Sequence, residues 1–339
     1  MPKGLVLAWS GQGGDWFVAM KTCLILNPKA GQKAGVTTNS FDLDDARDLL
    51  QRHGIEAEIF CTERADHATE LAKQAVADGY ERVLAAGGDG TVAEIAESLV
   101  GTRVTLGVLP LGSVMNVARM LGVPRDLEGA AAVITADRVA RIDVGQVKGT
   151  ARESFFLEAG GVGIDAGLFA YFNQMDRGNW RTIRPLLTFL WRYRPRRFYL
   201  RLDGKPLTTR AMMITIANGP YLGAALTLAP DAKLDDQMFD VRIFNRFSKF
   251  ELIRHFLSIT AGRRSYDPKI MTRRARVIDV RASRPLMAHA DSQPLGTTPV
   301  RFELIPSALS VYVGVDAACA PALSRPPAAM GAEPVTATS

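Results

Sequence analysis

The sequence has little cysteine and little histidine. Its 339 residues include three cysteines and four histidines, and neither set shows the short paired spacing of a zinc site. Cys23 and Cys61 lie in apolar, strand-like runs, so we expect buried thiols and a reducing compartment. A fold held together by disulfides and a metal centre built on histidine or cysteine are therefore not expected.

Long hydrophobic runs are also missing. No apolar stretch reaches the roughly 18–20 residues that a membrane-spanning helix needs. The apolar start at Gly4–Trp9 is too short for a secretory core. We expect residues 1–20 to be a disordered extension, with Met20 as a candidate natural start, and the Ala-, Pro- and Thr-rich residues 316–339 to be a disordered tail. These observations predict a cytoplasmic protein.

Acidic residues are fewer than basic ones. The 35 Asp and Glu residues face 41 Lys and Arg residues, which gives a net charge of +6. A basic balance favours anionic partners such as nucleotides, nucleic acid or an acidic membrane surface. The length suits about two domains.

The pattern of apolar runs predicts two domains of different class. Strands and helices alternate over residues 21–143, which is typical of an α/β domain with a parallel, doubly wound sheet. Strand-like runs dominate residues 144–315, which predicts a mostly antiparallel β domain whose last strand is free to return to the first domain. Helices are expected within the second domain near 164–172, 183–193 and 249–262. The cleft between the domains is the expected active site.

A glycine-rich turn stands at the centre of the first domain. Gly87-Gly88-Asp89-Gly90-Thr91 follows a short apolar run and precedes residues with helical spacing that include Glu94. A strand, a glycine turn and a helix start together form a natural phosphate site. A carboxylate beside phosphates is repulsive unless a cation lies between them, so Asp89 suggests Mg²⁺.

The same turn also fits a dinucleotide-binding fingerprint, Gly88-x-Gly90-x-x-Ala93. That fold needs an acidic residue at the end of the next strand, where this chain has Pro110-Leu111-Gly112. Two further loops, Asn27–Gly31 and Gly112–Asn116, end neighbouring strands of the expected sheet. Three phosphate-type loops at one sheet edge favour a nucleotide-binding site over a merely tight turn.

In this order the loops resemble the diacylglycerol kinase catalytic-domain superfamily, which includes bacterial soluble lipid kinases and the sphingosine and ceramide kinases. The resemblance covers about residues 21–315. It also rests on Leu109–Ser113 running into Ala118-Arg119, and on Asp235-Asp236 before Phe239-Asp240-Val241. The Gly-Gly-Asp-Gly element alone is shared with NAD kinases and phosphofructokinases.

The resemblance implies an ATP- and Mg²⁺-dependent lipid kinase. It implies a magnesium site around Asp89, Asn116 and Asp143. It also implies a structural cation at Asp236 with the carbonyls of Lys233 and Met238, for which an acidic turn before a strand is the plain alternative. The residues implied to bind ATP are Asn27, Pro28, Lys29, Ala30, Gly31, Thr62, Gly87, Gly88, Asp89, Gly90, Thr91, Glu94, Gly112 and Ser113.

The chain departs from the family pattern at several of these positions. The usual Asn before the Glu of the glycine motif is Ala93, and the Gly of the second-domain turn is Gln237. The usual Asn-Asp pair after Ser113, itself a Thr in the family, is Met115-Asn116, which loses a carboxylate near the metal.

The late Asp-Gly-Glu turn, whose glutamate is thought to deprotonate the lipid hydroxyl, is replaced by Asp291-Ser292-Gln293. An amide cannot accept that proton. Asp291 can act instead if its side chain faces the cleft. We therefore expect Asp89, Asp291 and Gln293 at the catalytic centre.

A basic stretch interleaved with Trp, Leu and Phe predicts contact with an anionic membrane surface. It runs from 177 to 210, contains the single acid Asp203, and is followed by a second basic stretch over 263–276. A nucleic-acid partner is not expected, because no recognition motif accompanies the charges; a solvated basic face is the plain alternative. The basic residues of the first stretch are Arg177, Arg181, Arg184, Arg192, Arg194, Arg196, Arg197, Arg201, Lys205 and Arg210.

The sequence thus predicts a kinase that phosphorylates a hydroxyl of diacylglycerol or of a sphingoid or ceramide-type lipid, at the inner face of the membrane. Asn116 and Gln293 leave a catalytically weak or inactive nucleotide- and lipid-binding relative as the alternative. An NAD kinase is a third, weaker interpretation. A homodimer is left open.

Overall fold

The structure is a computed structural model of the whole chain. It describes residues 7–9, 16–18, 20–30, 32–33, 36–37, 41–176, 179–223, 226–245, 247–248, 250–251, 254, 258 and 269–319. Gly31, most of the helix expected over 249–262, and the tail beyond Cys319 lie outside the described residues.

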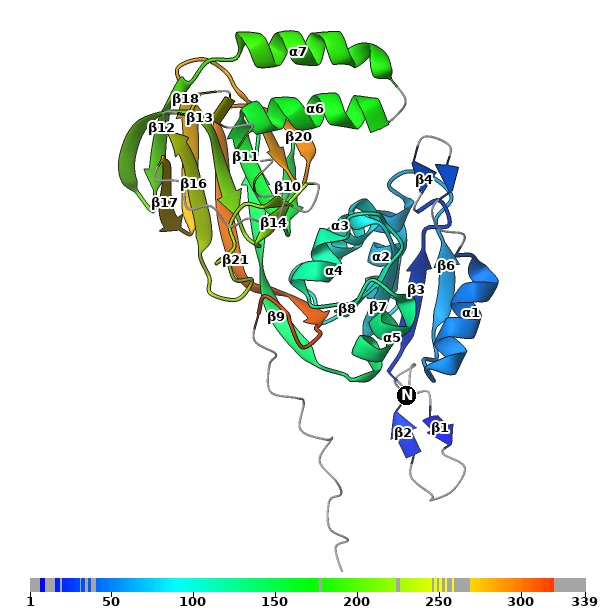
Figure 1. The fold of residues 1–339 in the computed structure, drawn as a ribbon. Helices are drawn as coiled ribbons and strands as arrows, with labels where there is room; N and C mark the ends of the chain where they lie inside the picture. Colours follow the sequence, from blue (N-terminus) through cyan, green and yellow to red (C-terminus); the bar gives the residue numbers. More distant parts are fainter. Residues whose placement is uncertain are drawn as a thin grey trace, which may run out of the picture.

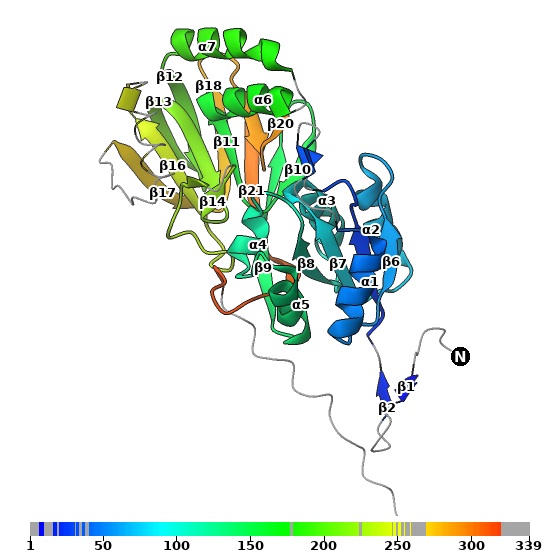
Figure 2. The same ribbon diagram turned by 45° about the vertical axis from the view of Figure 1, so that its right-hand side comes forward.

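The first domain is built on a parallel sheet with the strand order β6–β3–β7–β8 (Figure 1). Helix α1 packs against α5, and α2 packs against α3. Right-handed crossovers place these two pairs on opposite faces of the sheet (Figures 1 and 2). The elements are β3 (Thr22–Leu26), α1 (Leu43–Arg52), β6 (Glu58–Cys61), α2 (His67–Ala77), β7 (Arg82–Gly87), α3 (Asp89–Leu99), β8 (Thr105–Pro110), α4 (Asn116–Met120) and α5 (Leu127–Thr135).

The central strands of this sheet form because their residues are apolar on both faces. All five residues of β3 and all six of β8 are buried, as expected for parallel strands covered by helices on both sides. Helix α1 begins at a capping box: the carboxylate of Asp42 accepts the backbone N–H of Asp45, and the carboxylate of Asp45 accepts the backbone N–H of Asp42. These signals made the first domain predictable in outline.

Two long strands connect the first domain to the second. β9 (Val139–Lys148) and β21 (Val300–Tyr312) pair antiparallel along most of their length. The end of β21 joins the first sheet, where Ser310 lies opposite Thr105 of β8 in parallel register. One continuous sheet therefore runs through both domains, and the last strand does return to the first domain.

The second domain is mostly antiparallel, with the strand order β20–β19–β11–β13–β12–β18–β21, with β16 paired to β13 and with β17 paired to β16. Its core contains the stacked rings of Phe156 and Phe239, 5.5 Å apart. The elements are β10 (Glu153–Phe156), β11 (Ala159–Gly163), α6 (Ile164–Asp176), α7 (Ile183–Arg192), β12 (Arg196–Leu202), β13 (Lys205–Ala217), β14 (Tyr221–Leu222), β15 (Leu226–Thr227), β16 (Phe239–Asn245), β17 (Ile270–Ala275), β18 (Val277–Ala282), β19 (Met287–Ala290) and β20 (Gln293–Thr297).

Helices α6 and α7 cover the end of the second domain that lies farthest from β1 and β2 (Figure 1). A single 3-10 turn, Trp180–Thr182, leads into α7. The turn between β12 and β13 is the expected hairpin, with Asp203 and Gly204 at φ of 47° and 80°.

The expected fold class, a doubly wound α/β domain followed by a mostly antiparallel β domain, is confirmed. Two details differ from the sequence-based expectation. The apolar run at 155–161 is two strands, β10 and β11, interrupted at Leu157-Glu158. Short two-stranded pairs, β1 (Leu7–Trp9) with β2 (Trp16–Val18) and β4 (Gln32–Lys33) with β5 (Val36–Thr37), were not expected, and the first lies in the extension predicted to be disordered.

Candidate active site

The glycine turn connects the buried end of β7 to the first turn of α3. Gly87 must lack a side chain, because a Cβ there would lie 2.6 Å from the Cβ of Thr91. Gly90 differs: it is exposed, and a Cβ on it would meet nothing within 4 Å. The glycine at 87 is therefore explained by packing, whereas the one at 90 keeps open space above the helix start.

The Asn27 loop is tied to the glycine turn. Asn27 donates its side-chain N–H to Thr91 Oγ1 at 2.9 Å and accepts from the backbone N–H of Lys29 at 3.0 Å. Pro28 and Lys29 are exposed, and Ala30 is half-buried. The loop thus presents a basic side chain beside the glycine turn, which suits a phosphate.

The third loop closes on the glycine turn from the other side. The backbone N–H of Leu111 donates to the Gly87 carbonyl at 2.9 Å. A Cβ at Gly112 would lie 2.8 Å from the Cα of Gly88, so the two loops touch through their glycines. The structure therefore brings together all three strand-end loops, and the exposed Ser113 lies at their rim.

Asp89 joins the glycine turn to α4. Its carboxylate accepts the backbone N–H groups of Met115 at 2.8 Å and Val117 at 3.2 Å. Burial raises the pKa of this carboxyl, while these N–H groups act to lower it. Met115, where the helix begins, has a left-handed φ of 55°. Asp89 therefore positions the loop that carries Asn116.

Asn116 reaches from α4 into the second domain. Its side-chain nitrogen donates to Glu158 Oε2 at 2.6 Å and to the Gly223 carbonyl at 2.8 Å. Its side-chain oxygen is buried and has no hydrogen-bond partner among the residues that the structure describes. Sequence reasoning missed Glu158, because it stands inside an apolar run that has the pattern of one strand.

Glu158 is only 5% exposed. Burial raises the pKa of its carboxyl well above the usual range, and repulsion by Asp291 and Asp89 adds to this rise. Three carboxylates from the two domains thus lie within reach of one another's charge. Such a group is costly unless a cation or protons offset it.

Asp291 lies on the second-domain side of this cluster, where its carboxylate accepts three backbone N–H groups. The donors are Leu157 at 2.7 Å, Glu158 at 3.0 Å and Ala159 at 3.1 Å. Burial raises the pKa of Asp291 to about 6, against the lowering effect of these bonds. Its side chain is therefore oriented toward the Glu158 turn, which interrupts the apolar run at 155–161.

Gln293 does not join this cluster through any contact in the described structure. It is exposed at the start of β20, where it pairs with Ala290 of β19. Thr62 follows β6 beside the Asn27 loop, with its N–H bonded to the Leu26 carbonyl at 2.8 Å. Glu94 is half-buried one turn into α3, and burial raises its pKa.

The carboxylate of Asp143 is bonded to segments of the second domain. Its carboxylate accepts the backbone N–H of Gln237 at 2.6 Å and of Ser307 at 2.8 Å. It therefore joins the turn before β16 to β21. A place for Asp143 around the nucleotide's magnesium stays a prediction from the resemblance.

The second cation site predicted from the resemblance lies in that same turn. The guanidinium of Arg274 binds one oxygen of the Asp236 carboxylate, and the N–H of Met238 donates to the other at 3.1 Å. Arg276 donates to the Gln237 carbonyl at 3.1 Å. Because an arginine already supplies the positive charge at Asp236, the residues here do not fit a divalent cation.

The Asp89–Asn116 cluster fits a divalent cation better. The orphaned oxygen of Asn116 and the neighbouring carboxylate of Asp89 are the kind of oxygen ligands that Mg²⁺ prefers, and Glu158 is in direct contact with Asn116. No group of three or more His, Cys, Asp or Glu side chains already arranged as a metal site occurs among the described residues. The cluster therefore lacks a complete protein cage, which suits a metal that arrives with substrate phosphates and keeps its waters.

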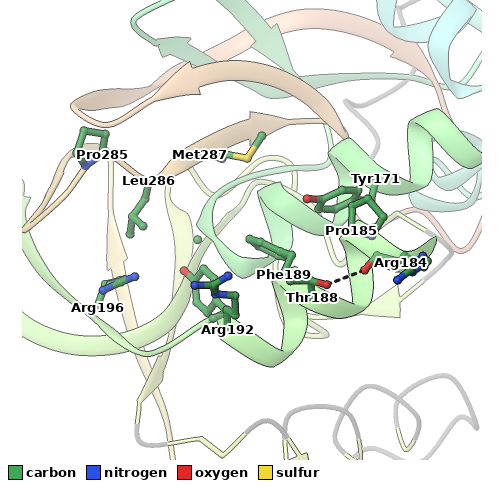
Figure 3. A pocket seen from close by; sticks show the side chains of 12 residues that line it. Tyr171, Arg184, Pro185, Thr188, Phe189, Arg192, Arg196, Pro285, Leu286 and Met287 are labelled. Atoms are coloured by element: carbon green, nitrogen blue, oxygen red, sulfur yellow. Dashed lines mark hydrogen bonds between the residues drawn. The ribbon is translucent and has the colours of Figure 1, made fainter. Parts of the chain in front are cut away.

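A cavity of about 720 Å³ lies under α7, away from the loops (Figure 3). Phe189, Leu286 and Met287 give it apolar walls, and Arg184, Arg192 and Arg196 also line it. Met287 begins β19, and Asp291 directly follows the end of that strand. At about 3.3 Å per residue, the cavity and Asp291 are separated by roughly 13 Å along β19.

Comparison with known families agrees with this arrangement. Residues 21–147 match the diacylglycerol kinase catalytic domain. Residues 160–313 match the YegS C-terminal NAD kinase beta sandwich-like domain. The chain belongs to the diacylglycerol kinase catalytic-domain superfamily. It is a lipid kinase by family, and kinases of this family use ATP.

Individual relatives of the superfamily match more than four fifths of the chain. A diacylglycerol kinase of Bacillus subtilis (strain 168) is 29% identical over 284 residues, covering 82% of this chain and 91% of the relative. One from Staphylococcus aureus (strain JH9) is 25% identical, covering 86% and 92%. A crystal structure of a diacylglycerol kinase from Bacillus anthracis str. Sterne has a TM-score of 0.66 at 23% identity and covers 87% of this chain and 97% of that chain, which shows a shared fold.

Among the residues that the structure describes, no helix is both long enough and apolar enough to cross a bilayer.

Proposed function

We propose that this protein transfers the γ-phosphoryl group of ATP to a hydroxyl of diacylglycerol, or of a related sphingoid or ceramide-type lipid, at a membrane surface. The observation that carries this proposal is the convergence of the three loops with a buried acidic cluster. The loops touch through Gly88 and Gly112, and the cluster joins Asn116 of the first domain to Glu158 of the second. A donor site and an acceptor site thus meet where the two domains join.

The loops supply the phosphate site. The start of α3 offers backbone N–H groups and the positive end of the helix dipole, and Gly90 leaves space for an anion to approach. Lys29 adds an exposed positive charge beside this space. These groups bind and orient the triphosphate of ATP.

Mg²⁺ would be held on the nucleotide side by Asp89 and Asn116. When bound, it neutralises charge on the phosphates and stabilises the charge that develops during transfer. Asp89 has a second task that needs no metal, because it fixes α4 and hence Asn116. Asp89→Asn should therefore impair both the site and its alignment.

Asp291 is the proposed proton acceptor for the lipid hydroxyl. Three backbone N–H groups fix its orientation, and a pKa of about 6 leaves it ionised at neutral pH while it remains basic enough to take a proton. Gln293 cannot take that proton and lies exposed. A positioned base typically contributes about 10²–10⁴-fold.

Helix α7 is the proposed contact with the membrane. Ile183, Leu187 and Trp191 follow one another at four-residue spacing, and their side chains are 39%, 59% and 76% exposed. Arg184 and Arg192 stand on the same helix. A short helix with an exposed apolar stripe and arginines is typical of a segment that lies in an anionic interface. The cavity beneath it would take the hydrocarbon of the lipid.

The test of catalysis is transfer of labelled phosphate from ATP to diacylglycerol, monoacylglycerol, sphingosine and ceramide in mixed micelles. We expect one labelled lipid, which Asp89→Asn abolishes. An undiminished rate in Asp89→Asn would refute the assignment. If the wild type transfers no phosphate while Gln293→Glu does, the result would instead favour a catalytically inactive nucleotide- and lipid-binding protein. Asn116 and the exposed Gln293 are the residues that motivate this alternative.

The test of membrane contact is sedimentation with vesicles that contain anionic phospholipid. Leu187→Glu should reduce the bound fraction, because it places a charge in the apolar stripe. Val315→Glu is the matched control, because it places the same charge at an apolar residue that is 83% exposed and lies outside α7 and outside the 177–210 stretch. Equal binding of both variants and the wild type would refute the role of α7.

A further inference from the structure

Glu158 is the one acidic side chain of the second domain that bonds directly to a first-domain loop residue of the site, within the described structure. Its carboxylate accepts from Asn116 at 2.6 Å, and the two residues are 42 positions apart in the sequence. Asn116 stands where the family pattern has an acid. The chain therefore lacks a carboxylate at position 116 but has one, that of Glu158, in direct contact with this position.

Hydrogen bonds hold the backbone of Glu158 on both sides of its Cα atom. Its N–H donates to Asp291 Oδ1 at 3.0 Å, and its carbonyl accepts the N–H groups of Asn218 at 3.0 Å and Gly219 at 2.9 Å. The side chain is then directed to Asn116 from a rigid origin. Such support is what a group that must hold its position in a site requires.

The amide of Asn116 is oriented by this contact. Its nitrogen has two hydrogens, and both are used, by Glu158 and by the Gly223 carbonyl. The amide oxygen is left buried and without a partner among the described residues. A buried oxygen that accepts no hydrogen bond is available to bind a cation, or to accept a hydrogen bond from a water on that cation.

We propose that Glu158, ionised when the nucleotide's divalent cation is bound, supplies the negative charge that Asn116 lacks, so that the pair Asn116–Glu158 acts as one carboxylate toward that cation. This inference rests on the proposed function. Glu158 is a positioning residue, because it acts through Asn116: it orients the amide oxygen and provides the charge behind it. The metal site depends on the charge of the pair and not on which residue carries it.

Two substitutions separate charge from hydrogen bonding. Glu158→Gln keeps the length and an accepting oxygen for Asn116, but removes the charge. The double variant Asn116→Asp with Glu158→Gln restores one charge to the pair and reverses the bond between them, with the new amide donating to the new carboxylate. It also loses the bond from Asn116 to the Gly223 carbonyl, so its Tm is compared with that of the wild type. A purely structural bond between residues 116 and 158 would survive in both variants, whereas the proposed role would fail only in the first.

The experiment measures binding of Mn²⁺ to the protein–ATP complex by electron paramagnetic resonance, with a thermal melt of each variant. We expect Glu158→Gln to weaken Mn²⁺ binding by about 10- to 100-fold, as loss of an outer-shell partner does. The double variant should recover most of that loss. Glu56→Gln is the matched control, because it removes an exposed carboxylate of the first domain away from the loops and should change nothing.

Two outcomes contradict the inference, and a third contradicts the proposed function on which it rests. Unchanged Mn²⁺ binding in Glu158→Gln overturns the inference. A double variant that keeps the wild-type Tm but binds Mn²⁺ at least 10-fold more weakly than the wild type also overturns it. A wild-type protein that binds neither ATP nor Mn²⁺ with ATP would instead overturn the proposed function on which the inference rests.

Discussion

Gly90 offers a prediction that separates the folded chain from its nucleotide complex. Among the glycines of the nucleotide loops, Gly87 and Gly112 are explained by contacts under 3 Å that any Cβ would make. Gly90 has an exposed position, no left-handed φ, and nothing within 4 Å of the place that a Cβ would take. Nothing in the protein alone explains why this residue is glycine.

The change Gly90→Ala should therefore leave the free protein stable or stabilise it. Alanine loses less conformational freedom on folding than glycine, which is worth up to about 1 kcal/mol in a helix. For a domain of this size that is a rise in Tm of roughly 2–4 °C. If the open space receives the phosphates of ATP, the same methyl group should weaken ATP binding about tenfold or more, which is about 1.4 kcal/mol.

The assay is isothermal titration with ATP beside a thermal melt in its absence. Gly112→Ala is the contrasting variant, because a Cβ there meets Gly88 Cα and Met115 Sδ at 2.8 Å each. It should lower Tm, since overpacking costs about 1–3 kcal/mol. Gly90→Ala that binds ATP as tightly as the wild type would refute the placement of the phosphates at this turn.

Two further predictions concern the second domain. Asp291→Asn should lower kcat by about 10²–10⁴-fold. In the wild type, activity should rise as pH increases through about 6, because below that pH Asp291 is protonated and cannot accept a proton. A flat pH profile of activity between pH 5 and 7 would argue against this base. Arg274→Ala should lower Tm slightly, because Arg274 pairs with Asp236. Because that pair already supplies the positive charge, millimolar Mg²⁺ or a chelator should leave the wild-type Tm unchanged in the absence of nucleotide. A large effect of the chelator would restore the predicted cation site.

The fold was predictable from the sequence because its signals are local. Fully apolar runs mark the buried strands of the first domain, and glycine or proline clusters end them. The hairpin at Asp203-Gly204 follows from two residues that tolerate left-handed φ. The three loops converge because parallel strands end at the same sheet edge.

The parts that could not be predicted depend on pairs far apart in the chain. Glu158 has the local appearance of a polar interruption in an apolar run, and its meaning depends on Asn116, 42 positions earlier. Arg274 belongs to a basic stretch typical of a surface, yet it binds Asp236, 38 positions earlier. No local pattern marks either partner, because each contact exists only once the distant segments that carry its two residues are folded against each other.

The most direct test of the account is the transfer of labelled phosphate from ATP to lipid by the unmodified protein, with Mg²⁺ and mixed micelles that contain diacylglycerol, monoacylglycerol, sphingosine or ceramide. The account predicts label in one of these lipids, and loss of that label in Asp89→Asn. Absence of labelled lipid with all four acceptors, from a folded protein that binds ATP, would contradict the claim that this site performs lipid phosphorylation.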